Sequence, residues 1–482
     1  MSSAKRAFEE EEEEGQRVVR GSHPLDVRPW GTLLFENPGE RASIASRRAQ
    51  GLGDFAALQD VVILSVLQLL DAKSLGALSC TSRTFLSYAS HDDLWRALAF
   101  DEFRTSETRF YSTWKECYWR NVLKLKLARR KPTVCTYSDL LYQSWYCANL
   151  EIPREWVERQ NVPRCANLSK DEFVERFERP NRPVIITDVV TKWPAFSKWG
   201  DRRYIVDAFE NELVHVGGYQ FDMNQYYEYI DKTNDEMPLY LFDKEFAAKS
   251  PVLKKDYEVP AYFEEDLFQV LGERERPDYR WLIIGPAKSG SSFHIDPNCT
   301  SAWNAVLSGR KKWVMFPPKV VPPGVHASEN GLNVATSVSI IEWFLNFYQE
   351  AREGTPDAPA GAMRECVVEA GEVIFVPRGW WHLVINLEES VALTQNYVSS
   401  ANLGHVLRYI RKGDLVSGCS REERETLHRR FTERLRERRP DLDRIHVKKR
   451  EGEAGEGGTN LASVFEKGGS NTGETAFKFN FF

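Results

Sequence analysis

The sequence predicts an α+β protein with more than one domain, in which short antiparallel strands fill the middle of the chain and helices flank them. Three observations support this prediction. A length of 482 residues corresponds to about two to four domains at about 100–200 residues each. Hydrophobic residues make up 42% and charged residues 28%, which is usual for folded proteins and excludes disorder throughout. Helical spacing of apolar residues dominates the first third of the chain, and alternating apolar positions dominate from Arg182 onward.

Composition excludes several functional classes. Lys and Arg total 64 against 70 Asp and Glu, so a net charge of −6 gives no overall basic surface for wrapping nucleic acid. The most apolar window, residues 61–70, is far shorter than the about 20 residues that span a membrane, and the acidic N-terminus does not resemble a secretory signal. The 8 cysteines include no CxxC pair. We therefore expect reduced thiols, no membrane partner, and a location in the nucleus or cytoplasm.

Composition and periodicity divide the chain into six regions. A six-glutamate run with few periodic apolar residues near the N-terminus and a Gly-rich C-terminus predict disorder at both ends. In chain order the regions are a disordered acidic arm (1–50), a helical module (51–105), a helical linker (106–165), a β-rich domain (166–400), C-terminal helices (401–450) and a flexible tail (451–482).

Residues 58–100 have the pattern of several short amphipathic helices, which predicts a small helical core. An apolar first helix, the connector LDAKSL, the segment LSCTSRTF and a final DDLWRAL follow in an order that resembles the F-box. The F-box docks on the Skp-type adaptor of cullin ubiquitin ligases, so the resemblance implies an adaptor-binding surface within residues 58–100. Further along, Ser169 and Glu172 have the spacing of a capping box and predict the start of a helix.

Residues 281–318 contain the first candidate metal ligands. His294 and Asp296 lie two residues apart on a predicted strand, so both side chains should point to one face. This spacing alone is weak evidence, because a lone His-x-Asp is more often a surface feature. A third candidate, His382, follows a second apolar strand and a turn with Pro and Gly. Two imidazoles and one carboxylate form the facial triad that binds Fe(II) and leaves three positions open, which suits a bidentate 2-oxo acid and O₂.

A bidentate 2-oxoglutarate would bring its distal carboxylate into the domain, so a cation and hydroxyl groups should point inward. Lys311 and Lys312 both lie on a suitable strand, and because neighbours on a strand face opposite sides, only one can serve. Periodicity does not choose between them. Thr394 and Asn396 share a face of a later strand, and Asn304 lies on the strand after the His-Asp pair. The alternative is a polar barrel lining without a cofactor.

Three segments together carry a specific resemblance. They are FHIDPNCTSAWNAVLSGRKKWVMFPP (293–318), GEVIFVPRGWWHLVINLEESVALTQNYVS (371–399) and PLYLFD (238–243). They resemble the Jumonji-C oxygenases. Within that family they are most similar to the branch that contains the arginine demethylase and lysyl hydroxylase once called the phosphatidylserine receptor. The resemblance runs from about residue 168 to 398. It implies a double-stranded β-helix, or cupin-type Jumonji-C barrel, with flanking helices, beside the small all-α F-box-like domain and the disordered termini.

The resemblance also assigns roles to individual residues. By position, His294, Asp296 and His382 match the iron ligands of the family, and Lys311 matches the lysine that pairs with the distal carboxylate of 2-oxoglutarate. Ser291 stands where the relative has a threonine that lines the same pocket. The remaining co-substrate contacts match Thr394, Asn304 and Tyr240. No ligand is replaced, so we expect an active enzyme with Fe(II), 2-oxoglutarate and O₂.

The region after the barrel leaves alternatives open. Residues 421–450 carry more Lys and Arg than Asp and Glu, and they end in the basic cluster Lys448, Lys449 and Arg450. These residues can form a solvated helix of mixed charge, a surface for an acidic partner or RNA, or a nuclear import signal. In the family that the chain resembles, C-terminal helices also help to form a homodimer.

We interpret the chain as a protein oxygenase that couples decarboxylation of 2-oxoglutarate, giving succinate and CO₂, to hydroxylation of a C–H bond. The expected substrate is a protein with a Lys or Arg side chain, of the histone or splicing-related type. Hydroxylation of a lysyl side chain is the first expectation, and hydroxylation of an arginine N-methyl group would appear as histone demethylation. Two alternatives are an F-box recruiting subunit of a ubiquitin ligase whose barrel only binds a target, and hydroxylation of an RNA base.

Overall fold

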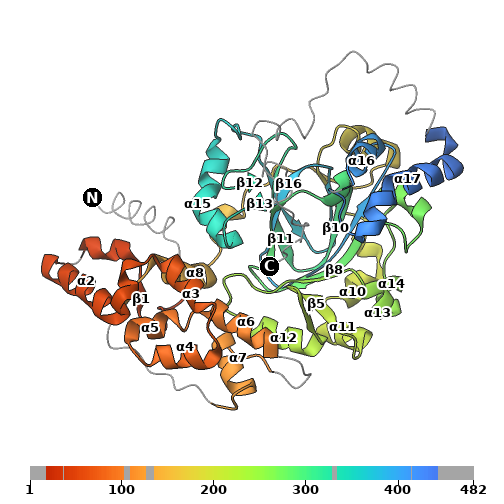
Figure 1. Cartoon of the computed structure of the whole chain (residues 1–482). Helices are drawn as coiled ribbons and strands as arrows, with labels where there is room; N and C mark the ends of the chain where they lie inside the picture. The colour runs from red at the N-terminus through yellow and green to blue at the C-terminus, as the bar shows by residue number, and fades with distance from the viewer. Residues whose placement is uncertain are drawn as a thin grey trace, which may run out of the picture. The chain divides into compact units, whose positions relative to one another are not determined.

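The computed structural model describes residues 18–35, 37–102, 109–125, 135–327, 334–413 and 415–442 (Figure 1). The chain divides into two compact units. The helical unit comprises Met1–Pro153 and Asn224–Met237, and the barrel unit comprises Arg154–Met223 and Pro238–Phe482. Among the described residues, no single helix has the length and apolarity needed to cross a membrane, although 41–57 and 60–67, bent by 73°, meet that criterion as a pair.

In its described part, the helical unit is built from short helices and one pair of parallel strands. The helices are α2 (Pro38–Leu52), α3 (Asp60–Leu67), α4 (Ala72–Ser79), α5 (Arg83–Tyr88), α6 (Asp92–Glu102), α7 (Trp114–Asn121), α8 (Asp139–Asn149) and α12 (Met223–Lys232), with the 3-10 helices η1 (Trp30–Phe35) and η2 (Gly53–Ala57) and the strands β1 (Val27–Arg28) and β2 (Thr136–Tyr137).

Helices α3 to α6 enclose the small core that the helical spacing predicts. Ile63, Leu75 and Trp95 have no exposed surface. Asp71 caps α4 and Ser82 caps α5, and each side chain accepts a hydrogen bond from the backbone N–H three residues later. These caps separate successive helices, so the alternation of apolar runs and capping residues in the sequence fixes where each helix begins.

The prediction of a disordered arm over residues 1–50 is wrong for its second half. Residues 38–50 form most of α2, on which Ile44 is buried. Arg48 pairs with Asp60 of α3 at 2.7 Å and donates a hydrogen bond to the hydroxyl of Tyr88 at 3.0 Å. Composition does not reveal such tertiary contacts. The glutamate run and the predicted tail, 451–482, lie outside the described residues, as do Lys448, Lys449 and Arg450.

The prediction of one helical linker over residues 106–165 is also wrong. Helices α7 and α8 belong to the helical unit, whereas residues 154–165 belong to the barrel unit. The helical unit further includes residues 224–237, because Trp114 Nε1 donates to Asp235 Oδ2 at 2.9 Å and the Tyr229 hydroxyl donates to the same oxygen at 2.7 Å. These partners are far apart in sequence, so a division by composition misses them.

Eight strands of the barrel unit form the predicted double-stranded β-helix (Figure 1). One half has the order β15-β10-β17-β8 and the other β14-β11-β16-β9, and all pairs within each half are antiparallel. The chain passes repeatedly from one half to the other. The strands are β8 (Arg280–Gly285), β9 (Gly290–His294), β10 (Ser301–Ser308), β11 (Arg310–Phe316), β14 (Arg364–Glu369), β15 (Val373–Val376), β16 (Trp381–Asn386) and β17 (Ser390–Tyr397).

Shorter strands extend the first half at both edges. Beyond β15 lie β4 (Val184–Ile186) and β3 (Arg164–Cys165), and beyond β8 lie β7 (Leu241–Asp243), β5 (Val214–Val216) and β6 (Tyr219–Phe221). A separate hairpin consists of β12 (His326–Ala327) and β13 (Val334–Ala335). Between β10 and β11 the chain turns at Gly309, whose φ of 76° and close approach to the backbone oxygen of Glu389 leave no room for a Cβ.

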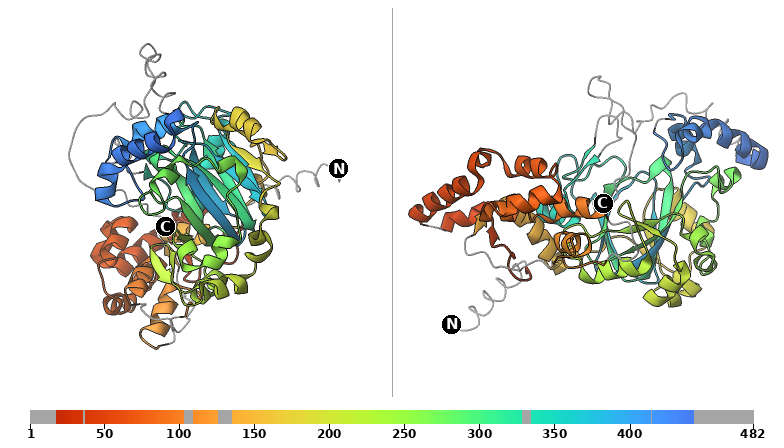
Figure 2. Two further views of the ribbon diagram at one scale, coloured as in Figure 1. Left: turned by 90° about the vertical axis from the view of Figure 1, so that its right-hand side faces the viewer. Right: turned by 60° about the horizontal axis from the view of Figure 1, so that its bottom comes forward.

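Helices cover the outside of these strands, as Figures 1 and 2 show. The predicted capping box of Ser169 and Glu172 is present at the start of α9. The helices, including the 3-10 and π segments labelled η, are η3 (Arg154–Trp156), α9 (Lys170–Phe173), η4 (Val174–Glu178), η5 (Val190–Lys192), α10 (Pro194–Lys198), α11 (Arg202–Phe209), α13 (Phe246–Lys249), α14 (Pro251–Lys255), η6 (Ala261–Phe263), η7 (Leu267–Leu271), η8 (Pro297–Cys299), α15 (Ile340–Glu353), α16 (Leu403–Ile410) and α17 (Arg421–Arg438).

Two of the apolar clusters in the described part of the barrel unit bear on its architecture. One lies between the two halves of the barrel and includes Val306, Trp313 and Ile374. The other joins α16 and α17 to η7, with Phe268 and Phe431 in edge-to-face contact at 4.8 Å between ring centroids. The C-terminal helices are therefore packed on the barrel unit within the described residues.

Candidate metal and co-substrate site

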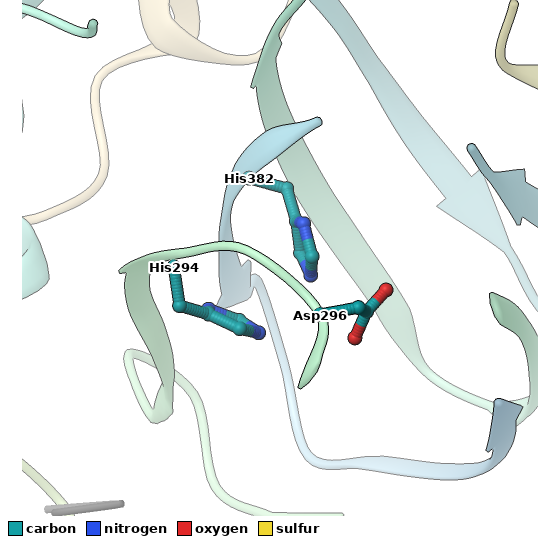
Figure 3. A group of neighbouring side chains, drawn as sticks. All are labelled: His294, Asp296 and His382. Atoms are coloured by element: carbon teal, nitrogen blue, oxygen red, sulfur yellow. The ribbon is translucent and has the colours of Figure 1, made fainter. Parts of the chain in front are cut away.

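Three candidate metal ligands lie together at one end of the barrel. His294 is the last residue of β9, and it is paired directly with His382 near the start of β16. Their ring centroids are 4.1 Å apart. One ligand atom from each of His294, Asp296 and His382 lies within 4.8 Å of the other two. Figure 3 shows the three side chains pointing toward one another.

Asp296 reaches this cluster from the short connection between β9 and η8 and not from a strand. The sequence predicts that Asp296 shares a strand with His294, but β9 ends at His294. Asp296 has extended backbone immediately before the 3-10 helix η8. The expectation of a shared strand is therefore wrong, and the proximity of the two side chains arises from the way the chain turns into η8.

Both imidazoles are neutral near pH 7 and carry the lone pair on the same nitrogen. Burial lowers the pKa of His294 and of His382 to about 4. Nδ1 of His294 lies 2.8 Å from the Ser292 carbonyl oxygen, and Nδ1 of His382 lies 3.1 Å from that of Trp380. Because a carbonyl oxygen can only accept a hydrogen bond, Nδ1 is the protonated nitrogen and Nε2 has the metal-ligating lone pair.

Asp296 supplies an oxygen donor to the same cluster. Burial raises its pKa to about 6, against the opposing effects of His294 and of a hydrogen bond from Asn396. Its Oδ2 is buried without a hydrogen-bond partner among the described residues. A buried carboxylate oxygen in this state is costly, and a divalent cation would satisfy it. Two neutral imidazoles and one carboxylate are the donor set that suits Fe(II) with open coordination positions, so these residues fit the expected metal.

Lys311 lies inside the barrel on β11 with no exposed surface. Its Nζ donates hydrogen bonds to the Tyr240 hydroxyl at 2.9 Å and to Asn386 Oδ1 at 2.7 Å. Both acceptors are neutral, and burial lowers the pKa of Lys311 to about 7. The structure thus places two of the candidate co-substrate residues, Lys311 and Tyr240, in direct contact. The ammonium group of Lys311 has no counter-charge among the described residues.

The other candidate co-substrate residues lie on strands of the same barrel. Asn304 on β10 and Thr394 on β17 are directly paired across the two strands. Asn304 Oδ1 is buried without a hydrogen-bond partner among the described residues, and the Thr394 hydroxyl donates to the Trp303 carbonyl oxygen at 2.9 Å. Ser291 is half-buried on β9, opposite Val384. No hydrogen bond joins Ser291 to the other candidates within the described residues.

Two residues at this site were not predicted from the sequence. Asn386, the last residue of β16, lies opposite Lys311 and contacts it, and Ser289 accepts a hydrogen bond from Asn386 Nδ2 at 2.9 Å. The spacing of four residues between His382 and Asn386 was a usable signal, because it places both on one face of a strand. Ser289 had no comparable signal.

Comparisons with known proteins agree with this geometry. The family model of the cupin-like domain matches residues 169–402, and the F-box-like model matches residues 60–101. The chain is 44% identical to the "Arginine-specific demethylase JMJ22" of Arabidopsis thaliana over 473 residues, which cover 96% of this chain and 90% of that protein.

Two further relatives match a little over half of this chain. The "Bifunctional arginine demethylase and lysyl-hydroxylase psr-1" of Caenorhabditis elegans is 39% identical over 57% of this chain and 68% of its own length. The human "2-oxoglutarate and iron-dependent oxygenase JMJD4" is 27% identical over 51% of this chain and 63% of its own length. The names of these proteins describe arginine demethylation, lysyl hydroxylation and 2-oxoglutarate- and iron-dependent oxygenation.

Proposed function

Because the chain belongs to the Jumonji-C family of Fe(II)- and 2-oxoglutarate-dependent oxygenases and carries an F-box-like module, we propose that it hydroxylates basic side chains of a protein substrate. One observation supports this most directly. The His294, Asp296 and His382 cluster and the uncompensated cation of Lys311 occur in one barrel. A barrel that only binds a protein has no need for both, which disfavours a purely recruiting F-box subunit.

In this proposal His294 and His382 would each hold Fe(II) through Nε2, and Asp296 would hold it through a carboxylate oxygen. When bound with 2-oxoglutarate, Fe(II) supplies O₂ activation, with succinate and CO₂ as products and one oxygen atom inserted into a C–H bond of the substrate. The carbonyl groups of Ser292 and Trp380 orient the two imidazoles, since each fixes the proton on Nδ1. Burial keeps both rings neutral, so the protein does not have to lose a proton from them before the metal binds.

Lys311 binds the distal carboxylate of 2-oxoglutarate, and Tyr240 contributes a hydroxyl to the same group. Asn304 and Thr394 contact the co-substrate from the facing strands, and Ser291 lines the pocket. The support is the buried ammonium of Lys311, because an anion that enters the barrel requires such a partner. Asn304 would contact the co-substrate through its Nδ2, because 2-oxoglutarate has only hydrogen-bond acceptors.

The substrate is a protein with an N-methylated arginine or with a lysine. Arginine is favoured by the relative that covers nearly the whole chain and whose name describes an arginine-specific demethylase. Lysine is favoured by the relative whose name describes both activities. One reaction accounts for both, because hydroxylation of a lysyl carbon is stable, whereas hydroxylation of an arginine N-methyl carbon releases formaldehyde.

Peptides can separate the two outcomes. The full-length protein with Fe(II) and 2-oxoglutarate is incubated with histone-tail peptides that contain either N-methylarginine or unmodified lysine. Demethylation gives formaldehyde and a product that is lighter by one CH₂ group, and lysyl hydroxylation gives a product that is heavier by one oxygen atom. Turnover of neither peptide, with 2-oxoglutarate consumed only in the presence of RNA, would instead support the RNA-base alternative.

The F-box-like module provides the docking site for a Skp-type adaptor. On α3, and just after it, apolar side chains point away from the core of the helical unit: Val61, Val62, Val66 and Leu69 are 54%, 42%, 36% and 86% exposed. A row of exposed apolar residues of this kind marks a protein interface. The adaptor would cover it, and the oxygenase would then act within a ubiquitin ligase or be regulated by one.

Location, oligomeric state and RNA binding complete the proposal. We retain a location in the nucleus or cytoplasm, which imaging of a tagged full-length chain would test. A homodimer through α16 and α17 would appear as a doubled mass in light scattering. Binding of RNA or of an acidic partner to the C-terminal region would appear as a salt-dependent affinity.

A further inference from the structure

The ammonium group of Lys311 is hydrogen-bonded to neutral groups and not to a carboxylate. Its two hydrogen-bond acceptors are the Tyr240 hydroxyl and the Asn386 side-chain carbonyl, at 2.9 and 2.7 Å. Lys311 and Asn386 have no exposed surface, so water does not compensate the charge. An ammonium group has three N–H donors. Two are used by these acceptors, and one remains for another partner.

The orientation of the Asn386 amide is fixed by a chain of hydrogen bonds that ends at the backbone. The Ser289 hydroxyl donates to the Pro286 carbonyl oxygen at 2.6 Å, so its lone pairs face Asn386. Asn386 Nδ2 donates to Ser289 Oγ at 2.9 Å and to the Gly285 carbonyl oxygen at 3.4 Å. Since the NH₂ end of the amide meets only acceptors there, its oxygen must face Lys311.

The chemical type of this side chain matters as much as its position. An aspartate at position 386 would have nearly the same shape as Asn386 and would also accept a hydrogen bond from Lys311. It would neutralise the cation permanently, however, and the distal carboxylate of 2-oxoglutarate would enter a buried site of zero net charge. A neutral acceptor holds the ammonium in place and leaves its charge for the co-substrate.

We propose that Asn386 is a positioning residue for 2-oxoglutarate, which acts through Lys311 by fixing its ammonium group with a neutral acceptor so that the charge and the third N–H remain for the distal carboxylate. The inference rests on the proposed function of Lys311. It adds Asn386, and Ser289 behind it, as the groups that make this lysine available.

Anaerobic calorimetric titration of 2-oxoglutarate into the full-length Fe(II) protein tests the proposal. Asn386→Asp should lower the affinity at least about tenfold, since the new carboxylate competes for Lys311. Pyruvate has the same metal-chelating end but lacks the distal carboxylate, so the affinity of Asn386→Asp for pyruvate should stay within about twofold of the wild-type value.

The pH profile supplies a second measure. The 2-oxoglutarate affinity of the wild type should fall above a pH of about 7, where Lys311 loses its proton, and in Asn386→Asp this fall should move to higher pH because a carboxylate raises the pKa of its partner.

Two further variants keep the test decisive. Asn402→Asp is the matched control, since Asn402 is also a buried amide in the barrel unit but bonds to Ser301 and the Tyr397 backbone. It should leave the 2-oxoglutarate affinity unchanged. Ser289→Ala frees the Asn386 amide to rotate and should weaken 2-oxoglutarate binding severalfold. This variant replaces Asn386→Asp in the test if Asn386→Asp fails to fold.

The outcomes separate this inference from the proposed function. If Lys311→Ala abolishes 2-oxoglutarate binding while folded Asn386→Asp binds as the wild type does, the positioning role is wrong and the role of Lys311 stands. If Lys311→Ala also binds as the wild type does, the co-substrate assignment itself is wrong. An equal loss of pyruvate and 2-oxoglutarate affinity in Asn386→Asp would show a general structural defect and would overturn the inference.

Discussion

Lys311 and Lys312 are neighbours on β11 and are both buried, but they face opposite sides of the strand and opposite electrostatic environments. Lys312 forms an ion pair with the buried carboxylate of Glu365 at 2.7 Å, and Tyr348 donates a hydrogen bond to that carboxylate at 2.8 Å. Lys311 contacts only neutral acceptors in the described residues. One lysine is thus part of the structural core, and the other is a cation without a counter-charge.

Methionine substitutions should separate the two lysines. Lys311→Met should lower the affinity for 2-oxoglutarate at least about 100-fold, because an unpaired buried carboxylate costs about 3–5 kcal/mol. Lys312→Met should leave that affinity nearly unchanged but lower the free energy of unfolding by about 3 kcal/mol, since Glu365 keeps only Tyr348 and a half-exposed Arg159. Titration calorimetry and chemical denaturation measure the two effects. If the variants exchanged effects, the assigned faces of β11 would be wrong.

The affinity for 2-oxoglutarate should depend on pH through Lys311. Burial lowers the pKa of this lysine to about 7 in the protein without co-substrate, so the cation is lost as the pH rises through that value. Binding of the dicarboxylate requires the cation and therefore takes up a proton at higher pH. The dissociation constant should rise about tenfold per pH unit above about 7 and level off below it. Calorimetry between pH 6 and 9 in buffers of different ionisation enthalpy measures both the affinity and the proton uptake, and a flat profile would contradict the role of Lys311.

Metal binding should have the opposite pH dependence. Burial raises the pKa of Asp296 to about 6, whereas His294 and His382 are neutral down to a pH of about 4. Protonation of Asp296 competes with the metal, so the affinity for Fe(II) or Mn(II) should begin to fall below a pH of about 6. Asp296→Ala should reduce metal binding at all pH values. Asp278→Ala, which removes a half-buried partner of Lys244 in the same unit, is the control and should bind the metal normally. Unchanged metal affinity in Asp296→Ala would show that the metal lies elsewhere.

The exposed apolar residues of α3 should be required for adaptor binding and dispensable for catalysis. The double substitution Val62→Asp and Val66→Asp adds charge to the exposed face without touching the buried Ile63. Pull-down of a Skp-type adaptor should be lost, while 2-oxoglutarate turnover stays at the wild-type level. Retention of the adaptor by this variant would place its binding site elsewhere.

Surface substitution is a better test of this module than truncation. From the sequence, a protein starting near Cys135 is expected to keep the oxygenase and lose the adaptor. The structure shows that such a cut removes Trp114, which bonds to Asp235 in the segment 224–237 of the same unit. The truncation would remove a hydrogen-bond partner of the half-buried Asp235, so a loss of activity would not distinguish docking from misfolding.

The parts of the fold and site that the sequence predicted are those encoded locally or by long motifs. The capping box at Ser169 follows from four residues, and the barrel follows from three long segments that resemble a known family. Strand alternation alone left Lys311 and Lys312 equivalent, and only the resemblance chose between them. The structure now gives the physical difference, which is Glu365 on the outer face.

The sequence failed where distant segments meet. Residues 38–50 have a polar composition that predicts disorder, but Arg48 of α2 forms an ion pair with Asp60 and a hydrogen bond with Tyr88. Asp296 was expected on a strand because alternation does not reveal where a strand ends. Asn386 carries no motif, and its importance follows from pairing with Lys311 across two strands that are more than 60 residues apart. Pairing across a sheet is a tertiary property, so local patterns do not encode it.

Succinate formation by the purified full-length chain tests the central claim most directly. With Fe(II), ascorbate, O₂ and 2-oxoglutarate, and with an N-methylarginine or lysine peptide as substrate, NMR should detect succinate in step with hydroxylated or demethylated peptide. Asp296→Ala should give neither product, and Asp278→Ala should give both. Succinate and product formation by Asp296→Ala at the wild-type rate would contradict the assignment of the oxygenase site to His294, Asp296 and His382.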